Sequence, residues 1–381
     1  MTTCLTRSST LSPLLRRQSF SSSVKVTSRP IRWGILSAGK ISSDYVKAIS
    51  ITEGAEVAAV AARSAEKAES FALAHDIPKS YGSYDELLQD PSIDVVYVGS
   101  IANQHYNMAV QSLLAKKPTV VEKPLTLSLQ DTKKLVQLAK QQDVFLMEGM
   151  WTRCFPAMRK VKQLIEEGTI GKVSTIQGDF GWSTKDCGPE DRIWEKGCGG
   201  MTLDIGMYMV QLGQVGFQQS PSAIQAMGSH KNGVDHTILT NIQYGQDGFL
   251  QFYVTGDANT EERVVIQGTE GRIVLDPPAH VPETIRLFTD QGRGSTNEQV
   301  LEFPLPDDSY TTWNYPGSIG FTHQIQAVGE ALKAGKKECL HFTHDNSLEL
   351  ASVLDDILQQ VNGQPSEKED ADHHVDQQEM V

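Results

Sequence analysis

Between residues 31 and 150, short runs of apolar and mostly β-branched residues alternate with longer segments in which apolar residues recur every three or four positions. The short runs are typical of buried parallel strands, and the longer segments are typical of amphipathic helices. Their alternation predicts a parallel, Rossmann-type sheet with right-handed crossovers. We expect its strands at 31–36, 57–62, 93–99, 120–123 and 144–148.

The pattern changes after residue 151. A helix over 157–167 and a strand over 172–182 precede a glycine turn that leads into a helix around 199–208. From 222 to 303, short β-branched segments are joined by glycine turns, which predicts a large, mainly antiparallel open sheet with one face free to cover helices or another subunit. The expected fold class is therefore α/β, with an N-terminal Rossmann-type parallel sheet and a C-terminal α+β domain.

These patterns divide the chain into four segments. We expect a transit or disordered segment over 1–29, a dinucleotide-binding domain over 30–150, a substrate and dimerisation domain over 151–362, and a disordered tail over 363–381. Up to Arg32 the chain has six basic and no acidic residues and is rich in serine, which is typical of a mitochondrial transit peptide. A disordered extension that targets nothing, and hence a cytoplasmic protein, is the alternative.

The amino-acid composition limits the classes of partner that the protein is expected to bind. The formal net charge of −13 at pH 7 disfavours nucleic acid and anionic membrane surfaces. No apolar run approaches the roughly 18 residues that a membrane-spanning helix needs. The five cysteines form no C-x-x-C pair and no cluster with histidine, so we expect reduced thiols and no metal site.

A turn of small residues follows the first strand, at the place where dinucleotide-binding folds hold the pyrophosphate. The G-x-G-x-x-G pattern appears here as Ser37, Gly39 and Ser42, with only the central glycine kept. That glycine lets the backbone approach a pyrophosphate, and the helix behind it offers free N–H groups and a positive dipole end. We therefore expect Ser37, Gly39, Lys40 and Ile41 to contact a dinucleotide.

Two further strand ends are expected at the same edge. The second strand ends in Arg63 instead of the acid that would bind the ribose of NAD, and a guanidinium suits the 2′-phosphate of NADP. A solvated arginine at a helix start is the alternative. Ser100, Asn103 and His105 follow the strand over 93–99 and are expected to contact the cofactor, although His105 can equally be a helix-start residue without a ligand.

The stretch Glu122-Lys123-Pro124 ends a buried strand at a charged tip. Since Pro124 cannot donate to a sheet, the strand is expected to stop there and to place Lys123 in the crevice where open α/β sheets bind ligands. Farther along, Asp204 and Tyr208 are four residues apart and share one helix face. An acid in so apolar a segment needs a partner or a role. A surface lysine, a capping aspartate and a packing tyrosine are the alternatives.

Together these stretches resemble the glucose–fructose oxidoreductase/inositol dehydrogenase family over residues 31–362. The resemblance rests on the turn at Gly39, on Glu122-Lys123-Pro124, on the segment from Met147 to Arg153, and on the segment from Gly199 to Tyr208. Within the family the chain is similar to the branch of dihydrodiol and NADP-dependent D-xylose dehydrogenases. The resemblance implies oxidation of an aldopyranose at its anomeric hydroxyl or of a trans-1,2-dihydrobenzene-1,2-diol type of cyclic diol, and a homodimer through the second sheet.

The resemblance also assigns residues. It implies that Lys123 and Tyr208 line the site where nicotinamide meets substrate and that Asp204 positions the substrate or tunes Tyr208. It also adds Glu122 and Arg153 to the cofactor contacts. Oxidation of an alcohol needs a base for the hydroxyl proton. We expect Tyr208 to be that base, with Lys123 and the charged nicotinamide lowering its pKa; Lys123 as the base is the alternative.

Aromatic residues around this site bear on the substrate. Trp151, Phe155 and Phe180 are expected to form an apolar wall, and ordinary core packing is expected for at least one of them. Another polyol, an inositol or an imine as substrate is an alternative within the family. A non-enzymatic regulator that senses a dinucleotide is a second alternative, against which the joint presence of Lys123, Asp204 and Tyr208 argues.

Overall fold

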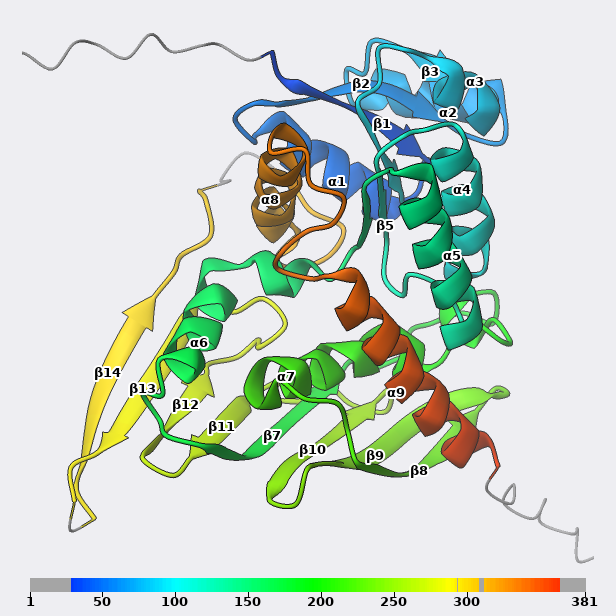
Figure 1. The fold of residues 1–381 in the computed structure, drawn as a ribbon. Helices are drawn as coiled ribbons and strands as arrows, with labels where there is room; N and C mark the ends of the chain where they lie inside the picture. Colours follow the sequence, from blue (N-terminus) through cyan, green and yellow to red (C-terminus); the bar gives the residue numbers. More distant parts are fainter. Residues whose placement is uncertain (1–28, 293, 308–311, 364–381) are drawn as a thin grey trace, which may run out of the picture.

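The computed structural model describes residues 29–292, 294–307 and 312–363 and contains two sheets with helices packed on them (Figure 1). The first sheet is parallel throughout, with the strand order β3-β2-β1-β4-β5-β6. Its strands are β1 (Ile31–Leu36), β2 (Ala55–Ala61), β3 (Ser80–Tyr81), β4 (Val95–Val98), β5 (Thr119–Val121) and β6 (Leu146–Glu148). The helices that connect them are α1 (Lys40–Ser50), α2 (Ala65–Ala74), α3 (Tyr84–Gln89), α4 (Ala102–Leu114) and α5 (Leu129–Gln142). The strand order reverses beside β1, so the carboxyl ends of β1 and β4 border the crevice where such sheets bind ligands.

The second sheet has the strand order β14-β13-β12-β11-β7-β10-β9-β8. Strands β7 and β10 pair in parallel, and the other neighbours pair antiparallel. Its strands are β7 (Val173–Gly181), β8 (Ala223–Lys231), β9 (Val234–Tyr244), β10 (Gly248–Thr255), β11 (Val264–Gly268), β12 (Gly271–Leu275), β13 (Thr284–Asp290) and β14 (Thr296–Glu302).

Helices cover one face of this second sheet, as Figure 1 shows for α6, α7 and α9. The helical segments of this part of the chain are η1 (Trp151–Cys154), α6 (Pro156–Glu166), η2 (Arg192–Trp194), η3 (Thr202–Gly206), α7 (Met207–Phe217), η4 (Ser318–Gly320), α8 (Phe321–Lys333) and α9 (His344–Asn362). Buried and exposed residues alternate along β10, which places the apolar side chains of one face under the helices and leaves the other face open.

The predicted α/β fold class is confirmed, with differences at element boundaries. The strand expected to reach Lys123 ends at Val121. The glycine turn near residue 200 leads into a π-helical turn, η3, before the α-helix begins at Met207. The spacing of Asp204 and Tyr208 is therefore not that of a regular α-helix, although both are buried.

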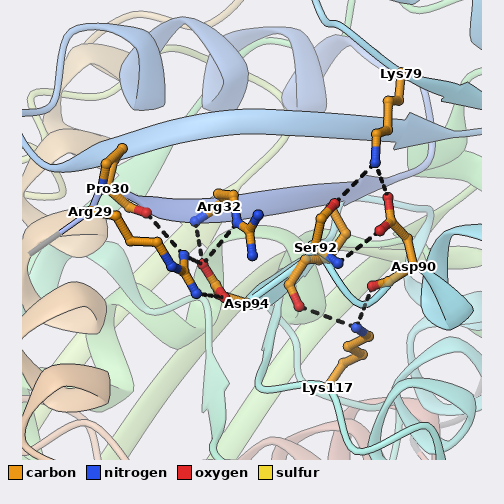
Figure 2. A network of polar contacts seen from close by, with 9 residues as sticks. Arg29, Pro30, Arg32, Lys79, Asp90, Ser92, Asp94 and Lys117 are labelled. Atoms are coloured by element: carbon orange, nitrogen blue, oxygen red, sulfur yellow. Dashed lines mark hydrogen bonds and ion pairs between the residues drawn. The ribbon is translucent and has the colours of Figure 1, made fainter.

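A network of charged side chains ties the opposite edge of the parallel sheet, where the strands begin (Figure 2). Asp94, just before β4, accepts hydrogen bonds from the Arg29 side chain and from the backbone N–H of Arg32, on β1. The Lys117 ammonium, just before β5, donates to the carbonyl oxygens of Asp90 and Ile93 at 2.7 and 3.1 Å. These contacts fix the amino ends of the strands and leave the carboxyl ends for a ligand.

The predicted mitochondrial transit peptide lies in residues 1–28, outside the described residues, and so does nearly all of the predicted tail. Within the described part of the chain, no helix is long and apolar enough to cross a membrane.

Candidate active site

The turn after β1 has the geometry of a phosphate-binding loop in spite of its serines. Ser37 has a φ of 92°, a left-handed conformation that favours glycine, so it stands where the pattern expects the first glycine. Gly39 caps α1 without any side-chain hydrogen bond, and the first turn of α1 contains no acidic residue. The free N–H groups of this turn therefore fit the pyrophosphate of a dinucleotide.

Ser42 replaces the third glycine of the pattern, and the structure shows how the close packing is kept. The Ser42 side chain is fully buried and its hydroxyl donates to the carbonyl of Gly99 at 3.4 Å. A Cβ atom at Gly99 would collide with the Ser42 oxygen. The missing glycine of the helix is thus compensated by a glycine at the end of β4.

The other expected cofactor contacts fall into two groups. Lys40 and Arg63 are exposed, whereas Ile41, Ser100 and Asn103 are half-buried, at the carboxyl ends of β1, β2 and β4. This edge is where the fold holds a dinucleotide, and contact of these five residues with it stays a prediction.

His105 lies between two backbone carbonyl groups at this edge. Its side chain is buried, and its two ring nitrogens lie 2.7 Å from the carbonyl oxygen of Pro124 and 3.1 Å from that of Ser100. The ring therefore ties the loop after β5 to the end of β4, and this placement favours a positioning role over contact with the cofactor.

Glu122 and Arg153 are also placed inside the protein. Glu122 accepts hydrogen bonds from the Tyr97 hydroxyl at 2.7 Å and from the backbone N–H of Lys123 at 3.3 Å. The Arg153 guanidinium lies over the ring of Phe342, 5.5 Å from its centre, and is 7% exposed. Burial lowers the pKa of Arg153 to about 10. Neither placement supports the expected contact with the cofactor, because both side chains are engaged in the core.

Lys123 and Asp204 are in contact, although Lys123 follows strand β5 of the parallel sheet and Asp204 lies in η3. The Lys123 ammonium donates to the backbone carbonyl of Asp204 at 2.6 Å and lies 3.5 Å from its carboxylate. Their side chains are 17% and 9% exposed. This pair joins the carboxyl edge of the parallel sheet to η3, so the two parts of the chain share one polar site.

Asp204 has two further partners that sequence reasoning missed. Arg192 donates to one carboxylate oxygen at 2.9 Å, and the indole N–H of Trp182 donates to the other at 3.2 Å. Burial by itself raises the pKa of Asp204, but the charges of Arg192 and Lys123 hold it well below its usual range. Arg192 lies in an aperiodic segment rich in glycine and charge, so its sequence could not be told from that of a solvated loop.

Arg192 also connects the site to α1. The backbone N–H groups of Asn314 and Tyr315 donate to the fully buried carboxylate of Asp44, in α1, at 2.9 to 3.0 Å. The Tyr315 side chain lies near Arg192, whose charge counteracts the rise in the Tyr315 pKa that burial causes. The segment before η4 therefore bridges the helix of the phosphate-binding turn and the Asp204 cluster.

Tyr208 lies beside Lys123, but its electrostatic environment differs from the one expected. The Lys123 ammonium is 5.3 Å from the centre of the Tyr208 ring, and the indole N–H of Trp151 donates to the Tyr208 hydroxyl at 2.8 Å. Burial raises the pKa of Tyr208 well above its usual range, and nearby carboxylates raise it further. The expected lowering of this pKa by Lys123 and a bound nicotinamide stays a prediction, since in the chain alone the effect of burial dominates.

An aromatic wall lies next to this tyrosine. Phe180 is 5.5 Å from Tyr208 between ring centres, and the His280 ring stacks on Phe180 at 4.6 Å. Trp151 packs against the same histidine at 6.3 Å. Phe155 is 1% exposed and packs against Trp151 in the core.

The site contains charged and hydroxyl groups without an evident metal centre. Within residues 29–292, 294–307 and 312–363, no three histidine, cysteine or acidic side chains are grouped to hold a metal ion. The arrangement instead joins a dinucleotide-binding edge, a lysine–aspartate–arginine cluster and a buried tyrosine. Such a set can bind a hydroxyl group and move its proton.

Comparison with known proteins agrees with this geometry. A sequence model described as "oxidoreductase family, NAD-binding Rossmann fold" matches residues 31–150, and one described as "GFO/IDH/MocA C-terminal domain" matches residues 158–274. The trans-1,2-dihydrobenzene-1,2-diol dehydrogenase of Danio rerio is 36% identical over 87% of this chain and 97% of its own length.

Solved structures show the same fold at low identity. A levoglucosan dehydrogenase in complex with NADH and levoglucosan has a TM-score of 0.77 and 18% identity, over 88% of this chain and 98% of its own. A 3-ketoreductase from Actinomadura kijaniata in complex with NADP has a TM-score of 0.73 and 22% identity, over 87% of this chain and 98% of its own.

Proposed function

This chain belongs to the GFO/IDH/MocA oxidoreductase family, and we propose that it is an NADP-dependent dehydrogenase that acts on a CH–OH group. The proposed substrates are an aldopyranose such as D-xylose, oxidised at its anomeric hydroxyl, and a cyclic diol of the trans-1,2-dihydrobenzene-1,2-diol type. The domains proposed for these tasks are residues 30–150 for the dinucleotide and 151–362 for the substrate.

One observation carries the proposal: Lys123 contacts Asp204 and lies over the Tyr208 ring, so that a cation, a carboxylate and a phenol from both parts of the chain share one site. Bound NADP supplies the hydride acceptor. Lys123 and the Tyr208 hydroxyl are the groups that hold the substrate hydroxyl, and the charge of Lys123 stabilises the oxygen as its proton leaves. Asp204 and Arg192 keep the lysine in place.

The charged side and the aromatic side of the site both support a sugar or a cyclic diol as substrate. Asp204, Lys123 and Arg192 offer charged hydrogen-bonding groups for a polyol, as a sugar or diol requires. Trp151 and Phe180 offer aromatic faces for the less polar side of a ring. The name of the Danio rerio relative supports a cyclic diol, and the family resemblance supports a sugar.

The preference for NADP rests on Arg63. Its exposed side chain follows the carboxyl end of β2, where the ribose of a bound dinucleotide lies in this fold. The position has no acidic residue to bind the hydroxyls of the NAD ribose. A guanidinium there favours a 2′-phosphate through paired, charge-assisted hydrogen bonds.

A homodimer is proposed through the open face of the second sheet. Met227, Leu239 and Tyr253 stand opposite one another on β8, β9 and β10 and are 60%, 50% and 41% exposed. Contiguous apolar side chains of this kind mark interaction surfaces. A second copy of the chain is the partner that the family resemblance implies.

The test is absorbance at 340 nm after the purified chain is mixed with NADP or NAD and a panel of D-xylose, D-glucose, an inositol and a trans-dihydrodiol. Formation of NADPH with the sugars or the dihydrodiol supports the proposal. A response to the inositol alone would favour another substrate within the family. Binding of dinucleotide without turnover of any substrate would favour a sensor and contradict the proposal.

A further inference from the structure

The surroundings of Tyr208 leave its hydroxyl proton without an acceptor. The indole N–H of Trp151 donates to the phenolic oxygen at 2.8 Å, so the hydroxyl must direct its own hydrogen elsewhere. Among the described residues, no acceptor is hydrogen-bonded to that hydrogen. A buried, protonated phenol can accept a substrate proton only if it passes its own proton on.

A histidine–carboxylate pair lies directly beside this phenol. The Nδ1 atom of His280 is 2.6 Å from a carboxylate oxygen of Glu262, and both side chains are 16% exposed. The His280 ring is 5.5 Å from the Tyr208 ring between centres and stacks on Phe180 at 4.6 Å. One nitrogen of the ring is thus held by Glu262, and the ring packs on Phe180 of the aromatic wall.

Backbone contacts fix the two loops that carry this pair, one before β11 and one after β12. The Thr152 hydroxyl donates to the carbonyl of His280 at 2.6 Å, and the N–H of Ala279 donates to the carbonyl of Glu262 at 2.9 Å. The backbone N–H of Glu262 donates to Asp179 at 2.9 Å. The pair is therefore held by β7, by the loop after β12 and by η1, and η1 also carries Trp151.

The hydrogen bond to Glu262 determines whether Nε2, the other ring nitrogen of His280, carries a proton or a lone pair. A carboxylate accepts hydrogen bonds, so we assign the proton of the neutral imidazole to Nδ1, which leaves a lone pair on Nε2. In the described part of the chain no hydrogen bond reaches Nε2. His280 therefore offers an acceptor on a ring whose centre lies 5.5 Å from that of the Tyr208 ring.

We propose that His280, oriented by Glu262, is the proton-relay partner of Tyr208. This inference rests on the proposed dehydrogenase function. The substrate hydroxyl transfers its proton to the Tyr208 oxygen as the Tyr208 hydrogen passes to Nε2 of His280, directly or through one water. The substrate C–H bond delivers its electron pair as hydride to NADP, so the products are a carbonyl compound, NADPH and an imidazolium that Glu262 stabilises.

His280→Asn tests the relay because asparagine can keep a donor toward Glu262 while it removes Nε2. We expect kcat to fall by about 100-fold or more, with the affinity for NADP and the melting temperature unchanged. His280→Ala should show the same loss, and imidazole in the buffer should restore its rate at least about tenfold. His75→Asn is the matched control, since His75 also packs on a phenylalanine, Phe71, but lies in the turn after α2.

A second readout does not depend on turnover. ¹⁵N NMR of the protein without NADP distinguishes the two imidazole tautomers, and we expect His280 to carry its proton on Nδ1 and none on Nε2. A proton on Nε2, a His280→Asn variant within threefold of the parent rate, or a loss that imidazole does not restore would each overturn the relay. If none of the sugars or diols leads the unsubstituted chain to reduce NADP, the proposed function fails as well.

Discussion

The Lys123 ammonium donates a 2.6 Å hydrogen bond to the backbone carbonyl of Asp204, a residue 81 positions later in the chain. Lys123 follows the short strand β5 of the parallel sheet, and Asp204 lies in the π-helical turn η3. A carbonyl and a carboxylate of the same residue thus hold one ammonium. The pair locks the dinucleotide-binding edge to the segment that presents Tyr208.

Replacing Lys123 tests the centre of the proposal. Lys123→Met keeps much of the side-chain length but removes the charge, and we expect kcat to fall by at least about 100-fold because the leaving proton and the developing oxyanion lose their cation. Steady-state kinetics with NADP and the best substrate of the panel measure this. Lys133→Met, at an exposed position of α5, is the control, and equal rates for both variants would contradict the role of Lys123.

The sequence predicted the parts of this site that depend on strand ends. Gly39 and Lys123 follow buried apolar runs, and parallel strands bring their carboxyl ends to one edge, so local pattern was enough to place them. Asp204 was found because an acid in an apolar segment needs a partner.

Contacts that depend on loop paths could not be predicted. Arg192 and His280 lie in segments without hydrophobic periodicity, and only the folded chain brings them to Asp204 and Tyr208. His105 was assigned to the cofactor from its place after a strand, and Arg153 from the family resemblance. Their burial is a property of tertiary packing, which a motif does not encode.

Arg192 is predicted to control the ionisation of Asp204. In Arg192→Gln the carboxylate loses one of the two cations that hold its pKa down, so this pKa should rise. Asp204 then becomes protonated at a higher pH, and the acidic limb of the profile of kcat/KM against pH should shift to higher pH. Arg192→Lys keeps a cation and should move the limb less. Identical pH profiles for the parent and Arg192→Gln would show that Arg192 does not tune this group.

The buried carboxyl group of Glu148 should make the stability of the protein depend on pH. Burial raises its pKa from 4.5 to about 7, although the backbone N–H of Leu125 donates to it at 2.9 Å. The folded state therefore holds a proton that the unfolded state releases above pH 4.5, and stability should fall between about pH 4.5 and 7, by up to ~3 kcal/mol.

Glu148→Gln removes this titration. Urea unfolding at pH 5 and pH 8 should show a larger gain in stability over the parent at pH 8 than at pH 5. A gain that is the same at both pH values would mean that Glu148 does not titrate in this range.

The open sheet face predicts the oligomeric state. Tyr253→Asp puts a charge into the row that Met227, Leu239 and Tyr253 form, and a dimer that buries this row should dissociate. Sedimentation or light scattering should give twice the chain mass for the parent and the chain mass for the variant. Leu73→Asp, at a residue of α2 that is 82% exposed, should remain dimeric. A parent that is a monomer at all concentrations would contradict the proposed interface.

Arg63 predicts the choice between the two dinucleotides. If its guanidinium binds the 2′-phosphate, Arg63→Ala removes a charged hydrogen-bonding partner, which is typically worth about 1.5–3 kcal/mol. The KM for NADP should therefore rise by about ten- to a hundredfold, while the KM for NAD, which has no phosphate at that position, should change little. Lys67→Ala is a suitable control because Lys67 is an exposed cation in the following helix α2. Initial rates with each dinucleotide at saturating substrate measure both constants. Equal increases for NADP and NAD would assign Arg63 to general attraction of the diphosphate and would remove the structural reason for preferring NADP.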